Sequence, residues 1–323
     1  MQKILVTGAA GYIGSVLVRQ LLNKNYKVRG ADILFFGGES LLDIYNHPNF
    51  EFIKGDIRDT EFIYRISEGI TDVIHLAAIV GDPACAKQPE LATQINWEAS
   101  KKLFDRCNET GISKFIFAST CSNYGKMEGD DFLNEESSLN PVSLYAELKV
   151  KFEKYLLNSP IKEGFSPTAL RFSTVYGLSP RMRFDLTVNE FIRDVVFSNN
   201  LEIFGEQFWR PYCHVEDLAS SCLSVLEAPA SKVRKNVFNV GDSSQNYQKK
   251  MIAEEILKII PDAKIKYIQK KEDPRDYRID FSKIQTQLGY KITKKVPDGL
   301  KEIYSVLKDG IISDAYAEKY KNV

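Results

Sequence analysis

The chain has 323 residues, 44% of them hydrophobic, so it can bury a large core and form more than one lobe. Lysine plus arginine and aspartate plus glutamate each total 43, and this net charge of zero argues against a nucleic-acid-binding surface. The five cysteines include no C-x-x-C pair and no two histidines stand at a metal-ligand spacing, so the sequence predicts neither a disulfide framework nor a bound metal.

The N-terminal half alternates short apolar runs with longer helical patterns. Strands are predicted over residues 4–6, 26–31, 50–54, 73–77, 115–119 and 168–172. A helix is predicted over residues 12–24, because Ile13, Leu17 and Leu21 recur on one helical face. Apolar strands separated by helices are typical of a parallel sheet covered on both faces. We therefore expect an α/β fold with a Rossmann-like, doubly wound parallel sheet.

The C-terminal part has a different pattern. Residues 178–210 are charged and irregular, whereas residues 236–240 and 264–268 are predicted strands. The expected division is a sheet domain of residues 1–175 and 210–240, with a smaller C-terminal lobe of residues 176–209 and 241–323.

The first predicted strand begins at residue 4. No signal peptide precedes it, and no apolar stretch is long enough to span a bilayer. Together with the odd number of cysteines, these features predict a cytoplasmic protein with no membrane partner.

A glycine-rich turn joins the first predicted strand to the first helix. Gly8, Gly11 and Gly14 have the spacing G-x-x-G-x-x-G, with Tyr12 and Ile13 before the third glycine. Glycines allow a tight turn and close approach of a pyrophosphate, and the helix N-terminus adds free N–H groups and a favourable dipole. The sequence therefore predicts a dinucleotide site at these five residues.

Asp32 closes the second predicted strand, where a carboxylate is expected to bind the adenosine ribose hydroxyls. The next four residues are apolar, so a 2′-phosphate would meet a carboxylate and no cation. NAD is therefore the predicted cofactor, in preference to NADP.

Tyr145 and Lys149 are four residues apart, which places them on one face of a helix. A free tyrosine has a pKa of about 10 and is a poor base at neutral pH. A nearby lysine and a positive nicotinamide ring would stabilise the phenolate and lower that pKa. The Y-x-x-x-K pattern alone is common on helix surfaces.

Flanking motifs make the pattern more specific: residues 115–125 (FIFASTCSNYG), 141–149 (PVSLYAELK), 171–177 (RFSTVYG) and 209–217 (WRPYCHVED). Together with the glycine turn, they resemble the extended short-chain dehydrogenase/reductase family, in its NAD-dependent nucleotide-sugar epimerase/dehydratase branch. The resemblance covers nearly the whole chain. It implies a triad in which Thr120 hydrogen-bonds the reacting sugar oxygen, Tyr145 takes its proton, and Lys149 binds the nicotinamide ribose.

The same resemblance implies further cofactor contacts. Asp56 and Ile57 would contact the adenine, Ala77 and Ala78 would end the strand beside the cofactor, and Asn96 would support it.

The resemblance also implies a nucleotide-diphosphate sugar as substrate, bound by the C-terminal lobe. Thr120 and Ser122 would lie beside the sugar, and Arg210 would bind the diphosphate, which favours forked cationic donors. Either Arg275 or Arg278 would be a second diphosphate arginine. Thr174 replaces the family's usual asparagine, and Asn189 would take over that contact.

Dehydratases of this branch carry an Asp-Glu pair directly after the catalytic threonine, where this chain has Cys121 and Ser122. Elimination would lack its acid and its base, so hydride chemistry at C4 is expected, as in a 4-epimerase. The alternative is a 4-dehydrogenase, because residues 78–85 and 178–186 resemble a subgroup that includes GDP-mannoheptose 4-dehydrogenases of surface polysaccharide pathways. A non-catalytic NAD-binding sensor is disfavoured because the triad is complete.

The resemblance also implies a homodimer that pairs helices near residues 90–108 and 145–157.

Overall fold

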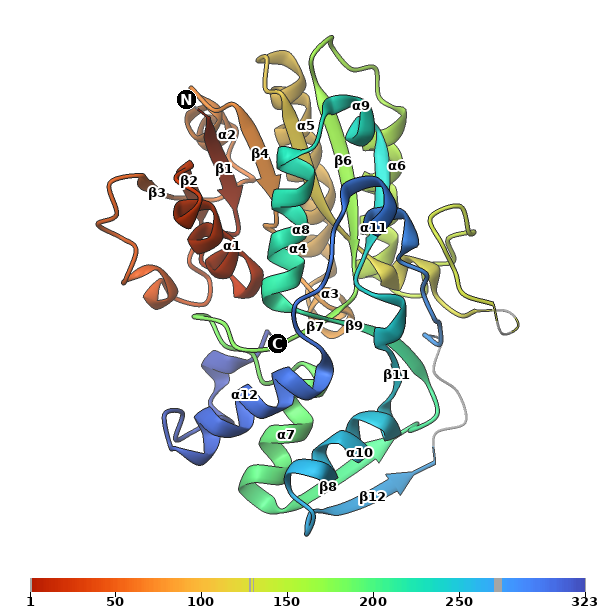
Figure 1. Ribbon diagram of the computed structural model, residues 1–323. Coiled ribbons are helices and arrows are strands. Elements are labelled where there is room, and N and C mark those ends of the chain that lie inside the picture. Colours follow the sequence, from red (N-terminus) through yellow and green to blue (C-terminus); the bar gives the residue numbers. More distant parts are fainter. Residues whose placement is uncertain (1, 128, 130, 270–274, 323) are drawn as a thin grey trace.

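The computed structural model describes residues 2–127, 129, 131–269 and 275–322 (Figure 1). Within these residues, the largest sheet has seven parallel strands in the order β10-β6-β5-β4-β1-β2-β3. Its strands are β1 (Lys3–Thr7), β2 (Lys27–Asp32), β3 (Phe50–Lys54), β4 (Asp72–His75), β5 (Lys114–Thr120), β6 (Ser166–Phe172) and β10 (Asn236–Val240). The predicted Rossmann-like α/β class is confirmed.

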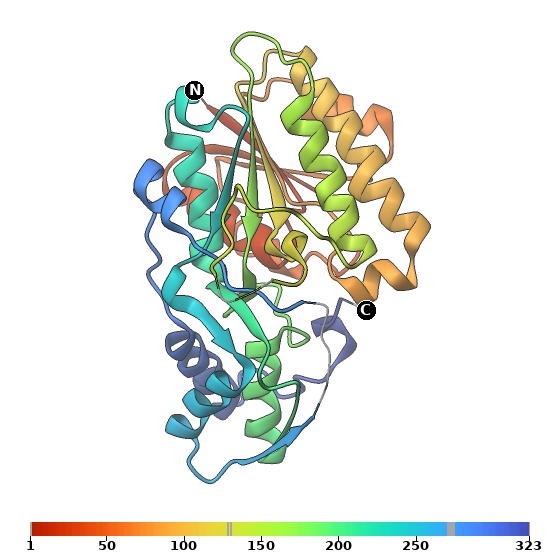
Figure 2. The ribbon, with the colours of Figure 1, turned by 90° about the vertical axis from the view of Figure 1, so that its right-hand side faces the viewer.

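Helices cover both faces of this sheet. On one face, α1 (Tyr12–Asn23) packs against α8 (Val215–Glu227). On the other, α5 (Ser100–Glu109) lies between α2 (Thr60–Ser67) and α6 (Leu144–Asn158), as Figure 2 shows for α5 and α6. The strand order reverses between β1 and β4, and ligands of such sheets bind at the carboxyl ends of the strands beside this reversal.

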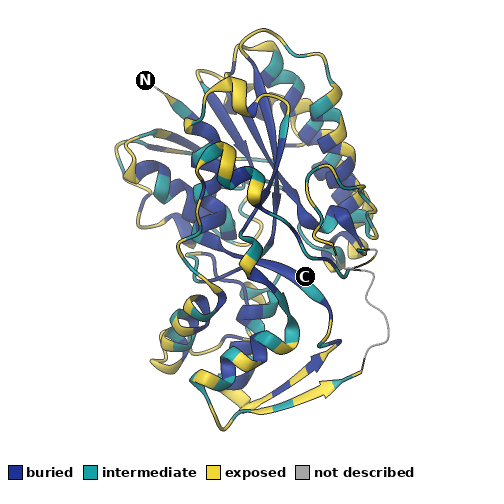
Figure 3. Cartoon of the chain, turned by 45° about the vertical axis from the view of Figure 1, so that its right-hand side comes forward, coloured by how far each residue is buried: buried dark blue, intermediate teal, exposed yellow. Residues whose placement is uncertain are grey.

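Short helices connect the remaining parts of the large sheet. They are α3 (Asp82–Lys87), α4 (Pro89–Thr93), a π-helical turn η2 (Gln94–Ala99), the 3₁₀ turns η1 (Glu39–Leu41) and η3 (Cys121–Tyr124), and α9 (Ala230–Val233). The inner strands β1, β4, β5 and β6 are almost entirely buried, and Figure 3 shows such strands as dark blue arrows.

The C-terminal part builds a second, smaller layer below the sheet in Figure 1. It contains the sheet β11-β9-β7 and the parallel pair β12-β8. The elements are β7 (Thr174–Tyr176), α7 (Thr187–Ser198), β8 (Asn200–Phe204), β9 (Trp209–His214), η4 (Ser243–Gln245), β11 (Asn246–Gln248), α10 (Lys249–Ile259), β12 (Lys264–Ile268), α12 (Val296–Lys308) and η5 (Glu318–Tyr320). Helix α11 (Ser282–Leu288) instead packs against β10 of the large sheet.

The sequence-based description of residues 178–210 as irregular is wrong, because α7, β8 and the start of β9 lie there. In α7, Val188, Ile192 and Val195 recur on one buried face, but charged neighbours mask that period in the sequence. Strand β9 pairs with β7 and β11 rather than with the large sheet.

Candidate active site

The turn after β1 fits a dinucleotide pyrophosphate. Gly8 has a φ of +74°, and a Cβ added to it would lie 2.9 Å from the Ala77 nitrogen. A Cβ on Gly14 would overlap the Gly8 carbonyl, so the turn closes only without these side chains. Gly11 is the N-cap of α1 and makes no side-chain cap hydrogen bond, which leaves the first-turn N–H groups open to an anion.

Asp32 lies at the end of β2, next to this turn. Its carboxylate accepts hydrogen bonds from the backbone N–H groups of Ala10, at 3.0 Å, and Leu34, at 2.8 Å. Burial raises the pKa of Asp32, and these N–H groups and the charge of Arg181 oppose the shift. Arg181 stacks on Phe36 with its Cζ atom 4.0 Å from the ring centroid. The expectation that no cation lies near Asp32 is therefore wrong, because Arg181 comes from a distant segment of the chain.

Residues at the carboxyl end of β4 are held in place by buried polar groups. The Thr7 hydroxyl accepts a hydrogen bond from the Ala77 N–H at 3.3 Å. Asn96 accepts from the Ile79 N–H at 2.8 Å and donates to the Ile79 carbonyl at 2.9 Å. Its amide therefore fixes Ile79 next to Ala77 and Ala78, and the expected cofactor role of Asn96 would be indirect, through this loop.

Asp56 and Ile57 follow β3, two strands from β1 at the sheet edge. Arg58 binds the Asp56 carboxylate at 2.6 Å and lowers its pKa, whereas Ile57 is buried in the core. Both residues lie at the carboxyl end of the sheet on the β2 side. If Asp32 binds the adenosine ribose as expected, the attached adenine would lie on this side of the sheet.

Helix α6 places Tyr145 and Lys149 one turn apart. Ser143 caps the helix, and its hydroxyl also donates to the carboxylate of Asp82 in α3 at 2.6 Å. Phe152, one turn beyond Lys149, packs edge-on against Phe117 of β5 with ring centroids 4.5 Å apart. Such buried aromatic pairs contribute about 0.5–1.5 kcal/mol beyond their buried area, so this contact helps to dock α6 on β5.

The Lys149 ammonium also links α6 to β5. Its Nζ donates to the Ala118 carbonyl at 2.7 Å and lies 5.8 Å from the centroid of the Tyr145 ring. That carbonyl is its one hydrogen-bond acceptor in the described part of the chain, so two of three N–H donors are left for a ligand. Burial lowers the pKa of Lys149 to about 8. Ala118 is two residues before Thr120, so the bond places Tyr145 and Thr120 in one region.

Burial raises the pKa of the Tyr145 phenol above its usual value, Asp82 adds to the shift, and Arg183 opposes it. Lys149 is not among the main contributors. Lys149 therefore does not lower the pKa of Tyr145 in the chain without its cofactor, contrary to the expectation. The phenol is protonated at neutral pH. Among the described residues, none hydrogen-bonds the Tyr145 hydroxyl, which leaves it free to contact a substrate.

Thr120 and Ser122 lie where β5 ends and η3 begins. The Thr120 side-chain oxygen accepts a hydrogen bond from the Ser122 N–H at 3.1 Å, which orients the hydroxyl at the strand end. Cys121 points the other way: its thiol is 1% exposed and donates to the Arg171 carbonyl at 3.2 Å. It is a core residue.

Arg210 and Arg275 both lie near Tyr277, a residue that was not predicted from the sequence and that lies close to Ser122 and Tyr145. Arg210 is 7% exposed, with its Cζ 5.4 Å from the Tyr277 ring centroid. Arg275 binds the Asp82 carboxylate at 3.0 Å, next to the cap of α6. Arg278 instead lies over Trp209, at 5.2 Å. The contact to Asp82 therefore favours Arg275 over Arg278 as the second arginine beside Tyr145.

Asn189 is placed differently from the prediction. It is fully buried, and its amide accepts from the Gly177 N–H at 3.0 Å and donates to the Arg183 carbonyl and the Tyr12 hydroxyl. The Tyr12 hydroxyl donates to the Gly177 carbonyl at 2.5 Å. Asn189 and Tyr12 thus join α7 to the first helix, and no amide group remains for a diphosphate. Thr174 is half-buried at the start of β7.

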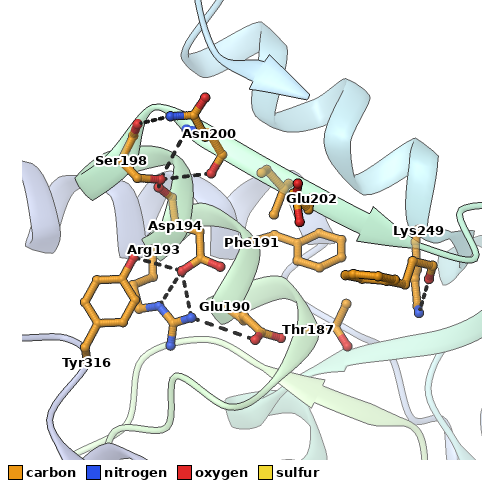
Figure 4. Close-up of a pocket in the computed structure, with 12 residues that line it drawn as sticks. Thr187, Glu190, Phe191, Arg193, Asp194, Ser198, Asn200, Glu202, Lys249 and Tyr316 are labelled. Atoms are coloured by element: carbon orange, nitrogen blue, oxygen red, sulfur yellow. Dashed lines mark hydrogen bonds and ion pairs between the residues drawn. The ribbon is translucent and has the colours of Figure 1, made fainter. Parts of the chain in front are cut away.

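A hollow of about 550 Å³ lies on the C-terminal lobe over α7 and β8 (Figure 4). Glu190 and Phe191 come from α7, Glu202 from β8, Lys249 from the start of α10, and Tyr316 from the C-terminal segment. The hollow could not be predicted from the sequence, because its lining comes from three separate segments: residues 187–204, Lys249 and Tyr316.

Comparison with known proteins places the chain in a family. Residues 4–241 match the "NAD dependent epimerase/dehydratase family". The chain is 31% identical over 314 residues, 92% of its length and 95% of the other, to the "uncharacterized UDP-glucose epimerase YtcB" of Bacillus subtilis. It is 27% identical over 307 residues, 92% of its length and 91% of the other, to a dTDP-glucose 4,6-dehydratase of Streptomyces griseus.

A solved structure shows the same fold at similar identity. The UDP-glucuronic acid 4-epimerase of Bacillus cereus, in complex with UDP-glucuronic acid and NAD, superposes with a TM-score of 0.83. It is 29% identical, and the match covers 95% of this chain and 99% of the other. The chain belongs to the NAD dependent epimerase/dehydratase family. It is an enzyme, and its cofactor is NAD.

Replacing Asp32 with alanine should weaken NAD binding roughly 10- to 100-fold, because hydrogen bonds to a charged group contribute about 1.5–3 kcal/mol. Titration calorimetry of the cofactor-free protein measures this. Asp43→Ala is the matched control, since that carboxylate is exposed and binds Arg19 of α1. Unchanged NAD affinity in Asp32→Ala would remove Asp32 from the site.

Proposed function

We propose that the enzyme oxidises the C4 hydroxyl of a nucleotide-linked sugar and re-reduces the ketone on its other face, as a 4-epimerase does. The observation that carries this proposal is the hydrogen bond from Lys149 to Ala118. It docks the helix that bears Tyr145 against the strand end that bears Thr120, at the carboxyl edge of the sheet. A phenol, a hydroxyl and an ammonium around one sugar hydroxyl can position it and move its proton.

The proposed roles follow from the contacts of each group. The Thr120 hydroxyl donates to the sugar oxygen while its own oxygen keeps the Ser122 N–H. Tyr145 accepts the C4 hydroxyl proton, and Lys149 uses its two remaining donors to hold the nicotinamide ribose. Bound NAD would supply the hydride acceptor and, when oxidised, a positive charge that favours the phenolate.

Arg210 and Arg275 are the proposed diphosphate ligands. Both are forked donors near Tyr277, which suits a dianion better than a single ammonium does. The Bacillus cereus structure contains UDP-glucuronic acid, which supports a nucleotide-diphosphate sugar as the class of substrate here.

Dehydration is disfavoured even though one relative is a dehydratase. Elimination needs an acid and a base beside the sugar, and the residue after Thr120 is a buried thiol whose pKa burial raises further. Ser122 adds no carboxylate.

A 4-dehydrogenase that releases the ketone remains the second candidate, on the same triad. Incubation with UDP-, GDP-, dTDP- and CDP-sugars separates the two. Isomerised sugar without net NADH supports the epimerase, and stoichiometric NADH with a keto sugar supports the dehydrogenase. Binding of nucleotide sugars with no redox change on any of them would contradict both and favour a sensor.

A homodimer through α5 and α6, a cytoplasmic location and a role in polysaccharide synthesis belong to the same proposal. No helix in the described ranges has the length and apolar character needed to cross a membrane.

A further inference from the structure

Tyr212 lies close both to the hollow over α7 and β8 and to Arg210 of the proposed diphosphate site. Tyr212 is two residues after Arg210 in β9, so both side chains emerge on the same face of that strand. The Thr187 side chain at the edge of the hollow lies beside the Tyr212 hydroxyl. The hollow is therefore where the part of a substrate beyond its diphosphate would extend.

The Tyr212 hydroxyl itself points to a ligand. Tyr212 is 1% exposed, and although the Thr187 side chain lies beside its hydroxyl, no described residue makes a hydrogen bond of normal geometry to that hydroxyl. Leaving a buried polar group unsatisfied costs about 1–3 kcal/mol, and such groups are uncommon. A phosphate or ribose oxygen between Arg210 and the hollow would satisfy it.

The carboxylates of the hollow differ in their partners. Asp194 accepts hydrogen bonds from Arg193, at 2.8 Å, and from the Tyr316 hydroxyl, at 3.0 Å. Glu202 binds Lys266 at 2.9 Å. Glu190 makes only an ion contact to Arg193 at 3.8 Å, drawn as a dashed line in Figure 4, and accepts no hydrogen bond from any described residue. It is the carboxylate that is available to a ligand.

Aromatic surface lies beside Glu190. Phe191 follows it in the chain and is almost buried, whereas Phe204 at the end of β8 is 52% exposed although it lines the hollow. An exposed phenylalanine in a polar hollow suits the flat face of a heteroaromatic ring, and base–aromatic stacking contributes about 1–3 kcal/mol per base.

We propose that this hollow holds the nucleobase of the substrate and that Glu190 selects guanine. This rests on the proposed function, which makes the substrate a nucleotide sugar. Guanine presents adjacent N1–H and 2-amino donors, which match the two oxygens of one carboxylate. Uracil and thymine present one N–H between two carbonyl oxygens, which a carboxylate repels. Adenine and cytosine present an amino donor beside an unprotonated ring nitrogen.

Titration of the NAD-loaded enzyme with nucleoside diphosphates tests this without turnover. GDP should bind roughly 100-fold more tightly than UDP, dTDP or ADP. Inosine diphosphate keeps N1–H but lacks the 2-amino group, so it should bind roughly tenfold more weakly than GDP. UDP or dTDP binding as tightly as GDP would overturn the proposal, and so would the absence of GDP binding.

Glu190→Gln gives the residue-level test. An amide has one acceptor and would set its NH₂ group against a guanine donor, so GDP affinity should fall roughly 30-fold and approach that of UDP. Glu255→Gln is the control and should change GDP affinity less than about twofold, because this carboxylate lies on α10 outside the lining of the hollow and binds Lys258 at 2.7 Å. Unchanged GDP affinity in Glu190→Gln would overturn the role of Glu190. Selective GDP binding without oxidation of any sugar would instead contradict only the proposed function.

Discussion

Replacing Tyr145 with phenylalanine should lower kcat at least about 1000-fold while NAD affinity stays within about twofold of the original enzyme. The change removes one hydroxyl, and no described residue hydrogen-bonds it, so packing and the fold should survive. What is lost is the group that exchanges the C4 proton. Steady-state turnover on the accepted nucleotide sugar and a cofactor titration measure the two effects separately.

Tyr155→Phe is the matched control for this variant. Tyr155 lies on the same helix, but its hydroxyl donates to Asp105 at 2.6 Å on the α5 side, away from the carboxyl edge of the sheet. It should retain near-normal kcat. Near-normal turnover by Tyr145→Phe would show that another group accepts the proton.

Replacing Glu153 with leucine should lower the free energy of unfolding by about 3–5 kcal/mol, because it leaves a buried guanidinium without its counter-charge. Glu153 is 1% exposed and binds Arg171 of β6 at 2.6 Å. It also accepts from the Ser119 hydroxyl at 2.6 Å, beside Thr120. The pair therefore holds α6 to β5 and β6 directly beneath the triad. Urea denaturation monitored by circular dichroism measures the change.

Glu147→Leu, an exposed position on the same helix, is the control and should change stability by no more than about 0.5 kcal/mol. If Glu153→Leu loses less than about 1 kcal/mol, the buried pair does not hold the helix in the way inferred. A double variant that also replaces Arg171 with methionine should recover part of the loss, since it removes the uncompensated charge.

The parts of the fold that could be predicted from the sequence are those set by local patterns. Strands β3, β10 and β12 lie at the predicted residues, because their apolar or alternating runs are bounded by turns. The glycine turn was also predictable, since Gly8 and Gly14 meet a steric demand within a few residues of each other. Helix α7 and strand β9 were missed because the burial of their charged side chains depends on partners elsewhere in the chain.

The candidate site likewise has residues that could be predicted from the sequence and surroundings that could not. The four-residue spacing of Tyr145 and Lys149 puts both side chains on one face of a helix, and this spacing can be read directly from the sequence. The surroundings of Tyr145 could not be predicted, because Asp82 and Arg275 are 193 residues apart and meet only in the folded chain. Asn189 shows the converse: its type suited a diphosphate, but Gly177, Arg183 and Tyr12 together use its amide hydrogen bonds. A sequence pattern can identify a candidate functional group, but the folded structure shows whether the hydrogen-bonding atoms of that group are free to bind a ligand.

The proposed reaction removes hydrogen from C4 of the sugar. The most direct measurement is a single turnover with a nucleotide sugar that carries deuterium at C4, followed by mass analysis of the bound cofactor and the sugar. The account predicts that deuterium passes to the nicotinamide, and that Tyr145→Phe prevents this transfer. Product formation while all of the deuterium stays on the sugar throughout, with none on the cofactor at any time, would contradict it.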